Sequence, residues 1–108
     1  MEGNVHIIKE NKIGRIQFSH PKGNCLPTHL LKALVQALET LDKDVQTHVV
    51  ILESKGNAFC AGASLSELKA VKNISEGTAF FMGFAVLLNT LREMSKFVLA
   101  RVHGKVVG

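Results

Sequence analysis

Tryptophan and tyrosine are missing from this sequence, and prolines and cysteines number only 2 each. Proteins that bind single-stranded nucleic acids hold the bases on aromatic side chains, so the absence of Trp and Tyr argues against that class. The two cysteines, Cys25 and Cys60, do not make a disulfide framework. Two reduced thiols in a cytoplasmic protein are therefore the expectation.

Long apolar runs and clustered charge are missing as well. The N-terminus has neither the apolar segment nor the cleavage site of a secretory signal. No stretch approaches the roughly 18 consecutive apolar residues of a membrane span. The formal net charge of +4 leaves room for an anionic partner, but Lys and Arg are scattered and form no basic run. Because nucleic-acid-binding surfaces concentrate their positive charge, we expect neither a nucleic acid nor a membrane as partner.

Hydrophobic periodicity predicts alternating strands and helices in what is at most one small domain of 108 residues. In chain order these are strands at 4–10 and 13–19, a helix from Thr28, a strand at 48–54, a loop at 55–63, a helix opening at Ser64, a helix at about 76–95 and a strand at 97–104. The first two strands form a tight antiparallel hairpin, and the last two are apolar enough to be buried. Helices between strands favour crossover connections, so we expect an α/β fold with a layered sheet and crossover helices.

The stretch KGNAFCAGASLSEL, residues 55–68, crowds small residues around one cysteine between a predicted strand and a predicted helix. It is not a Walker loop, because Gly56 and Gly62 are one residue too far apart and Ala63 stands where lysine is required. A nucleophilic Cys60 would need a histidine partner, and no spacing ties any of the five histidines to it. A buried thiol is therefore the favoured interpretation. The isolated histidines likewise predict no metal site.

The backbone of this stretch is the remaining candidate for chemistry. Ser64 and Glu67 have the spacing of a capping box, in which Ser64 accepts from the Glu67 amide and Glu67 reaches back. Amides at a helix N-terminus are unpaired, and small side chains let a ligand oxygen approach them. Two interpretations stay open here: half of an oxyanion hole, or a plain strand-to-helix turn.

Three ordered motifs extend over nearly the whole chain. They are His20-Pro21 with Asn24 and Leu26, then Phe59-Cys60-Ala61-Gly62-Ala63 with Leu65, then Val102-His103-Gly104 with Gly108. In this order they closely resemble the N-terminal part of the crotonase (enoyl-CoA hydratase/isomerase) superfamily. The resemblance implies the N-terminal part of the ββα spiral core of that fold. It also implies that residues 1–108 are the N-terminal part of a crotonase-like domain whose C-terminal part is absent from this chain.

The same resemblance implies roles for individual residues. The backbone amide of Ala63 becomes a donor to the thioester carbonyl oxygen of an acyl-CoA. The second donor is a glycine in a triple-glycine run, of which Gly108 matches only the first, so that donor lies just beyond this chain. The residues that resemble substrate-binding segments are Ala61, Gly62, Ser64 and Leu65, along the thioester and pantetheine, and Lys22, Gly23 and Asn24, at the turn that touches CoA. For Lys22, a solvated turn lysine is an equally good interpretation.

The implied reaction is acyl-CoA chemistry, most simply hydration of a 2-enoyl-CoA or a double-bond shift. Backbone amides stabilise an enolate-like oxyanion, and no cofactor is implied, since coenzyme A is part of the thioester substrate. The resemblance also implies that the parent protein is a homotrimer or hexamer. It does not choose between hydratase, isomerase, hydrolase and decarboxylase.

Two departures from the family pattern limit this expectation. Ser64 replaces the usual Asp, which keeps the helix cap but loses the carboxylate. The acid/base glutamates of the family lie after the glycine run, so Glu67, Glu76 and Glu93 match no catalytic position. We therefore expect the 108 residues alone to be inactive. The alternative is a non-catalytic crotonase-like fragment that acts as a structural or interaction module.

Overall fold

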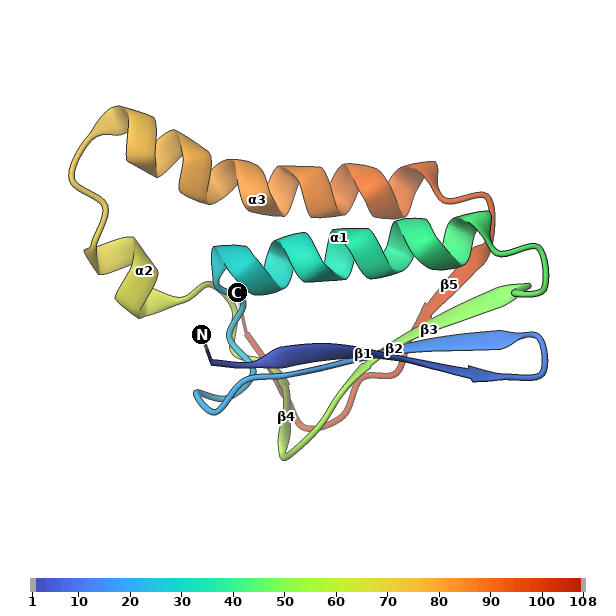
Figure 1. Cartoon of the computed structure of the whole chain (residues 1–108). Helices are drawn as coiled ribbons and strands as arrows, with labels where there is room; N and C mark the ends of the chain where they lie inside the picture. The colour runs from blue at the N-terminus through green and yellow to red at the C-terminus, as the bar shows by residue number, and fades with distance from the viewer. Residues whose placement is uncertain (1, 108) are drawn as a thin grey trace.

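The computed structural model describes residues 2–107 and has the expected mixture of strands and helices. Its elements are β1 (Asn4–Glu10), β2 (Ile13–Ser19), α1 (Thr28–Lys43), β3 (Val49–Ser54), β4 (Ala58–Cys60), α2 (Leu65–Lys69), α3 (Ile74–Glu93), β5 (Phe97–Ala100) and β6 (Lys105–Val106). In Figure 1, α1 lies between the sheet and α3, and the two long helices pack along each other. The predicted α/β class with a layered sheet is confirmed.

The main sheet has four strands in the order β1-β2-β3-β5. β1 and β2 form an antiparallel hairpin that turns at Asn11 and Lys12, where Asn11 adopts a left-handed φ of 55°. The pairs β2–β3 and β3–β5 are parallel, because α1 and α3 return the chain across the sheet between these strands. β4 and β6 form a separate short parallel pair.

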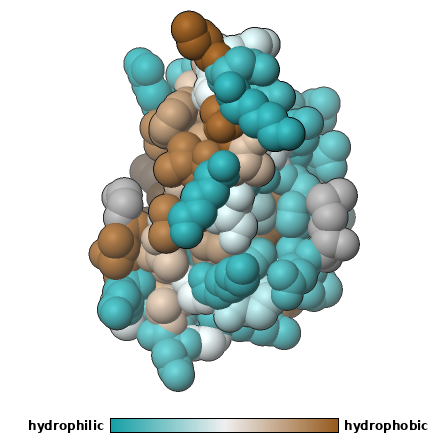
Figure 2. Space-filling view, turned by 90° about the vertical axis from the view of Figure 1, so that its left-hand side faces the viewer, coloured by the Kyte–Doolittle hydropathy of each residue, from teal (hydrophilic) through white to brown (hydrophobic). Residues whose placement is uncertain are grey.

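α3 is long and apolar, yet little of it is buried. Among the described residues it is the one helix whose length and composition would allow it to cross a membrane. Its buried residues are Phe80 and Leu87, whereas Phe81 is 60% exposed and Leu88 59% exposed. Figure 2 shows hydrophobic side chains reaching the surface at the α2 end of the molecule. Core helices of soluble proteins have the same length and composition, so the helix α3 does not identify a membrane as a partner. The absence of a membrane partner stays a prediction.

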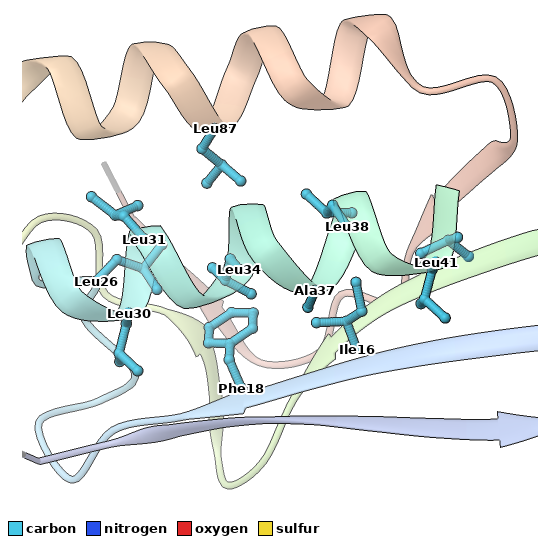
Figure 3. Packing of buried hydrophobic residues seen from close by; sticks show 11 residues of the cluster. Ile16, Phe18, Leu26, Leu30, Leu31, Leu34, Ala37, Leu38, Leu41 and Leu87 are labelled. Atoms are coloured by element: carbon cyan, nitrogen blue, oxygen red, sulfur yellow. The ribbon is translucent and has the colours of Figure 1, made fainter. Parts of the chain in front are cut away.

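The core lies between α1 and the sheet, and between α1 and α3. Ile16 and Phe18 point from β2 toward α1, and Leu87 points from α3 toward α1 (Figure 3). α1 contributes leucines to both sides, because its apolar residues recur every three to four positions and cover more than one face. The buried residues of α1 are Leu30, Leu31, Leu34, Ala37, Leu38 and Leu41. The helix predicted from Thr28 is confirmed.

Three predicted boundaries are wrong. The loop expected at 55–63 contains β4, a strand of three residues, which forms because β6 pairs with it. The last long strand ends at Ala100 instead of 104, and it is not buried: Phe97 is 79% exposed and Leu99 56%. The reason is that β5 lies at the edge of the sheet, where β3 is its single neighbour within residues 2–107. α3 begins earlier than expected because Asn73 caps it, its side chain accepting from the Glu76 amide at 2.8 Å.

Candidate functional site

The candidate site is the loop between β4 and α2, at residues 61–64. Gly62 has a φ of 93°, a conformation that L side chains rarely adopt, and it redirects the chain between strand and helix. Ser64 then caps α2, because its Oγ accepts from the Glu67 amide at 3.3 Å. This half of the predicted capping box is confirmed. The loop therefore ends in a short helix whose first amides face away from the helix body.

The other half of the predicted capping box is wrong, because the Glu67 carboxylate does not return to Ser64. Its Oε1 and Oε2 accept from the Thr28 amide at 3.1 and 3.2 Å, and Oε1 also accepts from the Thr28 hydroxyl. α1 begins after Pro27, which provides no side-chain cap, and its first turn contains no acidic residue. The unpaired N-terminus of α1 thus attracts the Glu67 carboxylate across the fold.

The amide of Ala63 takes no part in the hydrogen bonding that joins this loop to the Leu26 segment. The neighbouring Gly62 carbonyl accepts from the Leu26 amide at 2.8 Å, and Leu26 and Ala63 form an isolated parallel bridge. In such a bridge the amide of Ala63 itself points away from the partner segment. Within residues 2–107 this N–H has no hydrogen-bond acceptor. Ala63 itself is half-buried. Its amide is thus an unpaired donor close to the N-terminus of α2.

Asn24 joins the His20–Cys25 turn to the loop before β4. It is 4% exposed and has a φ of 61°. Its Nδ2 donates to the carbonyls of Lys55 at 2.5 Å and Ala58 at 2.8 Å, and its Oδ1 accepts from the His20 amide at 2.7 Å. Both amide hydrogens are thus used inside the protein, so the observed role of this side chain is structural. A contact between Asn24 and CoA stays a prediction.

The turn expected to touch CoA lies directly against the loop expected to hold the thioester. Lys22 Nζ donates to Ser66 Oγ at 3.3 Å. A Cβ added to Gly23 would be 3.4 Å from the Cβ of Ala61. Lys22, Gly23 and Ala61 are all exposed, and Leu65 is 67% exposed. The fold therefore brings together the two groups of residues that the sequence analysis assigned to one ligand.

The third motif lies beside the second one. His103 Nε2 is 2.6 Å from the Gly56 carbonyl oxygen, as an N–H donor to it. β6 then pairs in parallel with β4, and the Val107 amide donates to the Cys60 carbonyl at 3.0 Å. Because the two strands are parallel, β6 runs toward the same end as the loop that contains Ala63. Gly108, also expected at this site, lies outside the described residues.

Both cysteines lie near the loop in structural positions. Cys60 Sγ accepts from the Gly62 amide at 3.3 Å, and no histidine is hydrogen-bonded to Cys60 within residues 2–107. Cys25 is buried, and its Sγ lies 3.5 Å from His20 Nδ1. Burial raises the pKa of the Cys25 thiol, the nearby Cys60 raises it further, and Lys22 opposes both. The Cys25 thiol therefore remains protonated at neutral pH. Cys60, for which a buried thiol was the favoured interpretation, is only half-buried, so the burial expected for it is wrong.

A cavity that the sequence analysis did not predict lies between α1, α2 and α3. Its volume is about 810 Å³, and its wall is mainly apolar. The lining side chains include Leu31, Val35, Val71, Phe80, Met82 and Val86. Thr28 and Glu67 also line it, so their hydrogen-bonded pair is part of the wall. In the described part of the chain, no group of three or more His, Cys, Asp or Glu side chains is arranged to hold a metal ion.

Comparison with known proteins identifies the family. Residues 8–108 match the family model described as enoyl-CoA hydratase/isomerase. The chain belongs to the enoyl-CoA hydratase/isomerase family. The resemblance drawn from the three motifs is thereby confirmed, and so is the crotonase fold, over the N-terminal portion of its solved members.

Relatives in this family differ in the reactions for which they are named. A probable enoyl-CoA hydratase of Bacillus subtilis (strain 168) is 24% identical over 104 residues, which are 96% of this chain and 40% of the relative. A mitochondrial 3-hydroxyisobutyryl-CoA hydrolase of Danio rerio is 31% identical over 106 residues, which are 93% of this chain and 27% of the relative. Family membership therefore does not select one reaction.

Solved structures in the enoyl-CoA hydratase/isomerase family have the same arrangement of strands and helices over the portion that matches this chain. The crystal structure of an enoyl-CoA hydratase/carnithine racemase from Magnetospirillum magneticum matches with a TM-score of 0.85 at 27% identity, over 93% of this chain and 39% of that chain. The chain thus spans less than half the length of each of these three proteins, with shares of 40%, 27% and 39%.

Proposed function

We propose that the chain forms the thioester-binding part of an acyl-CoA-processing enzyme of the enoyl-CoA hydratase/isomerase type. In this proposal the Ala63 amide is one of two backbone donors to the thioester carbonyl oxygen, and the oxygen becomes enolate-like in the transition state. The single observation that supports it most is the unpaired N–H of Ala63 in the loop between β4 and the capped start of α2. Donors of this type lower a reaction barrier by about 3–4 kcal/mol each.

The surroundings of this amide support the same ligand. Lys22 and Gly23 adjoin the loop on its exposed side, where an ammonium group suits the phosphates of coenzyme A. The ligand needs no metal or separate cofactor in this proposal, since CoA is part of the substrate.

We further propose that the 108 residues do not turn over an enoyl-CoA by themselves. Proton transfer requires an acid or base within hydrogen-bond reach of the substrate. The Glu67 carboxylate accepts hydrogen bonds from Thr28, and the Glu76 carboxylate accepts one from the Lys72 amide at 2.9 Å. Glu93 is at the last position of α3 and is exposed. Two of these three carboxylates are thus hydrogen-bonded within the protein, and the third is exposed at a helix end. This arrangement supports a chain that provides an oxyanion donor but no general base.

The test is a titration of the ¹⁵N-labelled chain with crotonyl-CoA, followed by NMR. We expect shifts at residues 61–65 and 22–24, with a downfield proton shift at the Ala63 amide as it donates to the carbonyl oxygen. The matched control ligand is an S-alkyl CoA thioether, which lacks that carbonyl. It is expected to move the 22–24 turn but not Ala63. Equal responses of Ala63 to both ligands, or no response to either, would contradict the oxyanion-hole proposal.

A second candidate function is a non-catalytic interaction module. The observation that favours it is the number of large apolar side chains on the surface, such as Phe81 and Phe97, which are 60% and 79% exposed. The same titration separates the candidates, because an interaction module has no reason to respond to the carbonyl group of a thioester.

A further inference from the structure

α2 has little packing of its own to hold the candidate loop in place. The helix is only five residues long, and none of them is buried. Ser64 caps it, but that hydrogen bond, to the Glu67 amide at 3.3 Å, is local and does not connect α2 to the rest of the protein. The position of the loop therefore depends on contacts with other elements.

Two such contacts lie on either side of Ala63. Before it, the Gly62 carbonyl accepts from the Leu26 amide at 2.8 Å. After it, the Glu67 carboxylate accepts from the amide of Thr28, at 3.1 and 3.2 Å, and from its hydroxyl. Leu26 and Thr28 are two residues apart at the start of α1, and Leu26 is packed in the core with 8% exposure.

We propose that Glu67 is a positioning residue for the oxyanion-hole amide of Ala63, which it holds in place by anchoring the start of α2 to the start of α1. The role rests on the proposed function of Ala63. Glu67 does not touch the thioester. It acts because residues 62–67 are fixed at both ends to one rigid segment, so the Ala63 N–H keeps one orientation while no ligand is bound.

The electrostatics favour this anchor. A carboxylate at the N-terminus of a helix is stabilised by the unpaired amides and by the helix dipole, and hydrogen bonds to a charged group are stronger than neutral ones. α1 has 16 residues and carries six of the buried core side chains, so it is a rigid base for the anchor. Glu67 thus connects a short exposed helix to the best-packed element of the fold.

The experiment compares Glu67→Ala and Glu67→Gln with Glu39→Ala in the 108-residue chain. Glu39 is an exposed glutamate on α1 whose side chain makes no hydrogen bond or ion pair within residues 2–107, so it controls for the loss of one negative charge. The first measurement is NMR hydrogen exchange at the Leu26 amide, which Glu67 does not contact. We expect exchange about tenfold faster in Glu67→Ala, and a partial return toward the wild-type rate in Glu67→Gln, which keeps one acceptor oxygen.

The second measurement is the crotonyl-CoA titration described above. In Glu67→Ala we expect the carbonyl-dependent shift of Ala63 to be reduced, while the shifts of the 22–24 turn remain. Leu26 exchange and an Ala63 response equal to those of Glu39→Ala would overturn the proposal. Should Glu67→Ala not fold, Glu67→Gln decides alone: faster Leu26 exchange supports the anchor, and wild-type exchange refutes it.

The two proposals fail in different ways. If wild-type Ala63 does not respond to the thioester carbonyl, then the function proposed for Ala63 is wrong, whatever Glu67 does to Leu26. If wild-type Ala63 responds and Glu67→Ala changes neither the exchange nor the response, then only the positioning role is wrong.

Discussion

Asn24 and Gly104 are two small residues at which segments far apart in the sequence meet. Asn24 bonds the His20–Cys25 turn to the carbonyls of Lys55 and Ala58. Gly104 lies against the same loop, because the backbone of Asn57 passes where a side chain would be. Gly104 also has a φ of 65°. Both residues therefore fix the segment that leads into β4 and on to Ala63.

Replacing Gly104 should be costly for stability. In Gly104→Ala the new Cβ meets the Asn57 carbonyl oxygen directly, and the positive φ adds strain. We expect a loss of at least about 2 kcal/mol in the free energy of unfolding, measured by urea denaturation. Gly56→Ala is the matched control, since Gly56 has a φ of 88° but nothing within 4 Å of an added Cβ. Equal losses in the two variants would show that the close contact has no energetic weight.

Single residues also show which parts of the site a sequence can predict. The cap of α2 by Ser64 was predictable because donor and acceptor are three residues apart and depend on local geometry. The bond between Glu67 and Thr28 was not, because it spans 39 positions and requires the packing of α1 to be known. The same holds for His20 and Cys25, where five positions separate the two side chains but only the folded turn brings them together.

At the scale of elements, the C-terminus of α1 is held by one aspartate. Asp44 is the C-cap, and its carboxylate accepts from the Thr47 hydroxyl at 2.7 Å and the Gln46 amide at 3.1 Å. It also pairs with Lys9 of β1 at 2.9 Å. Nearby, Lys96 Nζ donates to the Leu41 carbonyl at 2.7 Å and to the Asp44 carbonyl. The end of α1 is thus joined to β1 and to the start of β5.

Asp44 should make stability depend on pH in the acidic range. The bond to Lys9, followed by those to Thr47 and Gln46, holds the pKa of this carboxyl well below its usual range. A depressed folded-state pKa contributes stability that is present above the unfolded pKa, about 4, and is lost as the pH falls through the folded pKa. We expect Asp44→Asn to be less stable than wild type near pH 7, with the difference shrinking below about pH 4.

Thermal unfolding followed by circular dichroism, at several pH values between about 3 and 7, would measure this difference. Glu93→Gln is the control for the removal of one exposed negative charge from a helix end. A difference between wild type and Asp44→Asn that is the same at every pH would mean that the aspartate acts through its shape and not through its charge.

The elements differ in how well sequence predicts them. The spacing of leucines predicted α1 because apolar side chains that recur every three to four positions must be buried whatever the helix packs against. β4 was missed because a strand of three residues has too little alternation to detect, and it exists through pairing with β6. β5 was expected to be buried because its residues are apolar, but burial of a strand depends on its neighbours in the sheet.

At the scale of the whole molecule, apolar side chains are exposed on the short C-terminal strands as well as along α3. Phe97 and Leu99 on β5 are 79% and 56% exposed, and Val106 on β6 is 55% exposed. β5 pairs with β3 on one side, and among the described residues no strand pairs with its other side. An unpaired edge with apolar side chains promotes association, because both backbone hydrogen bonds and hydrophobic surface are available.

We therefore predict that the 108-residue chain self-associates through β5. Sedimentation velocity over a concentration series should show an average mass that rises with concentration. Phe97→Lys combined with Leu99→Lys should lower that mass toward 11.8 kDa, since charge on an edge strand opposes pairing. The control is Ile74→Lys, because Ile74 is 88% exposed at the first position of α3, at the opposite end of that helix from the connection to β5. A wild-type chain that stays at the monomer mass throughout would show that the exposed edge does not drive assembly, and the trimer or hexamer expected of the parent protein would then need another interface.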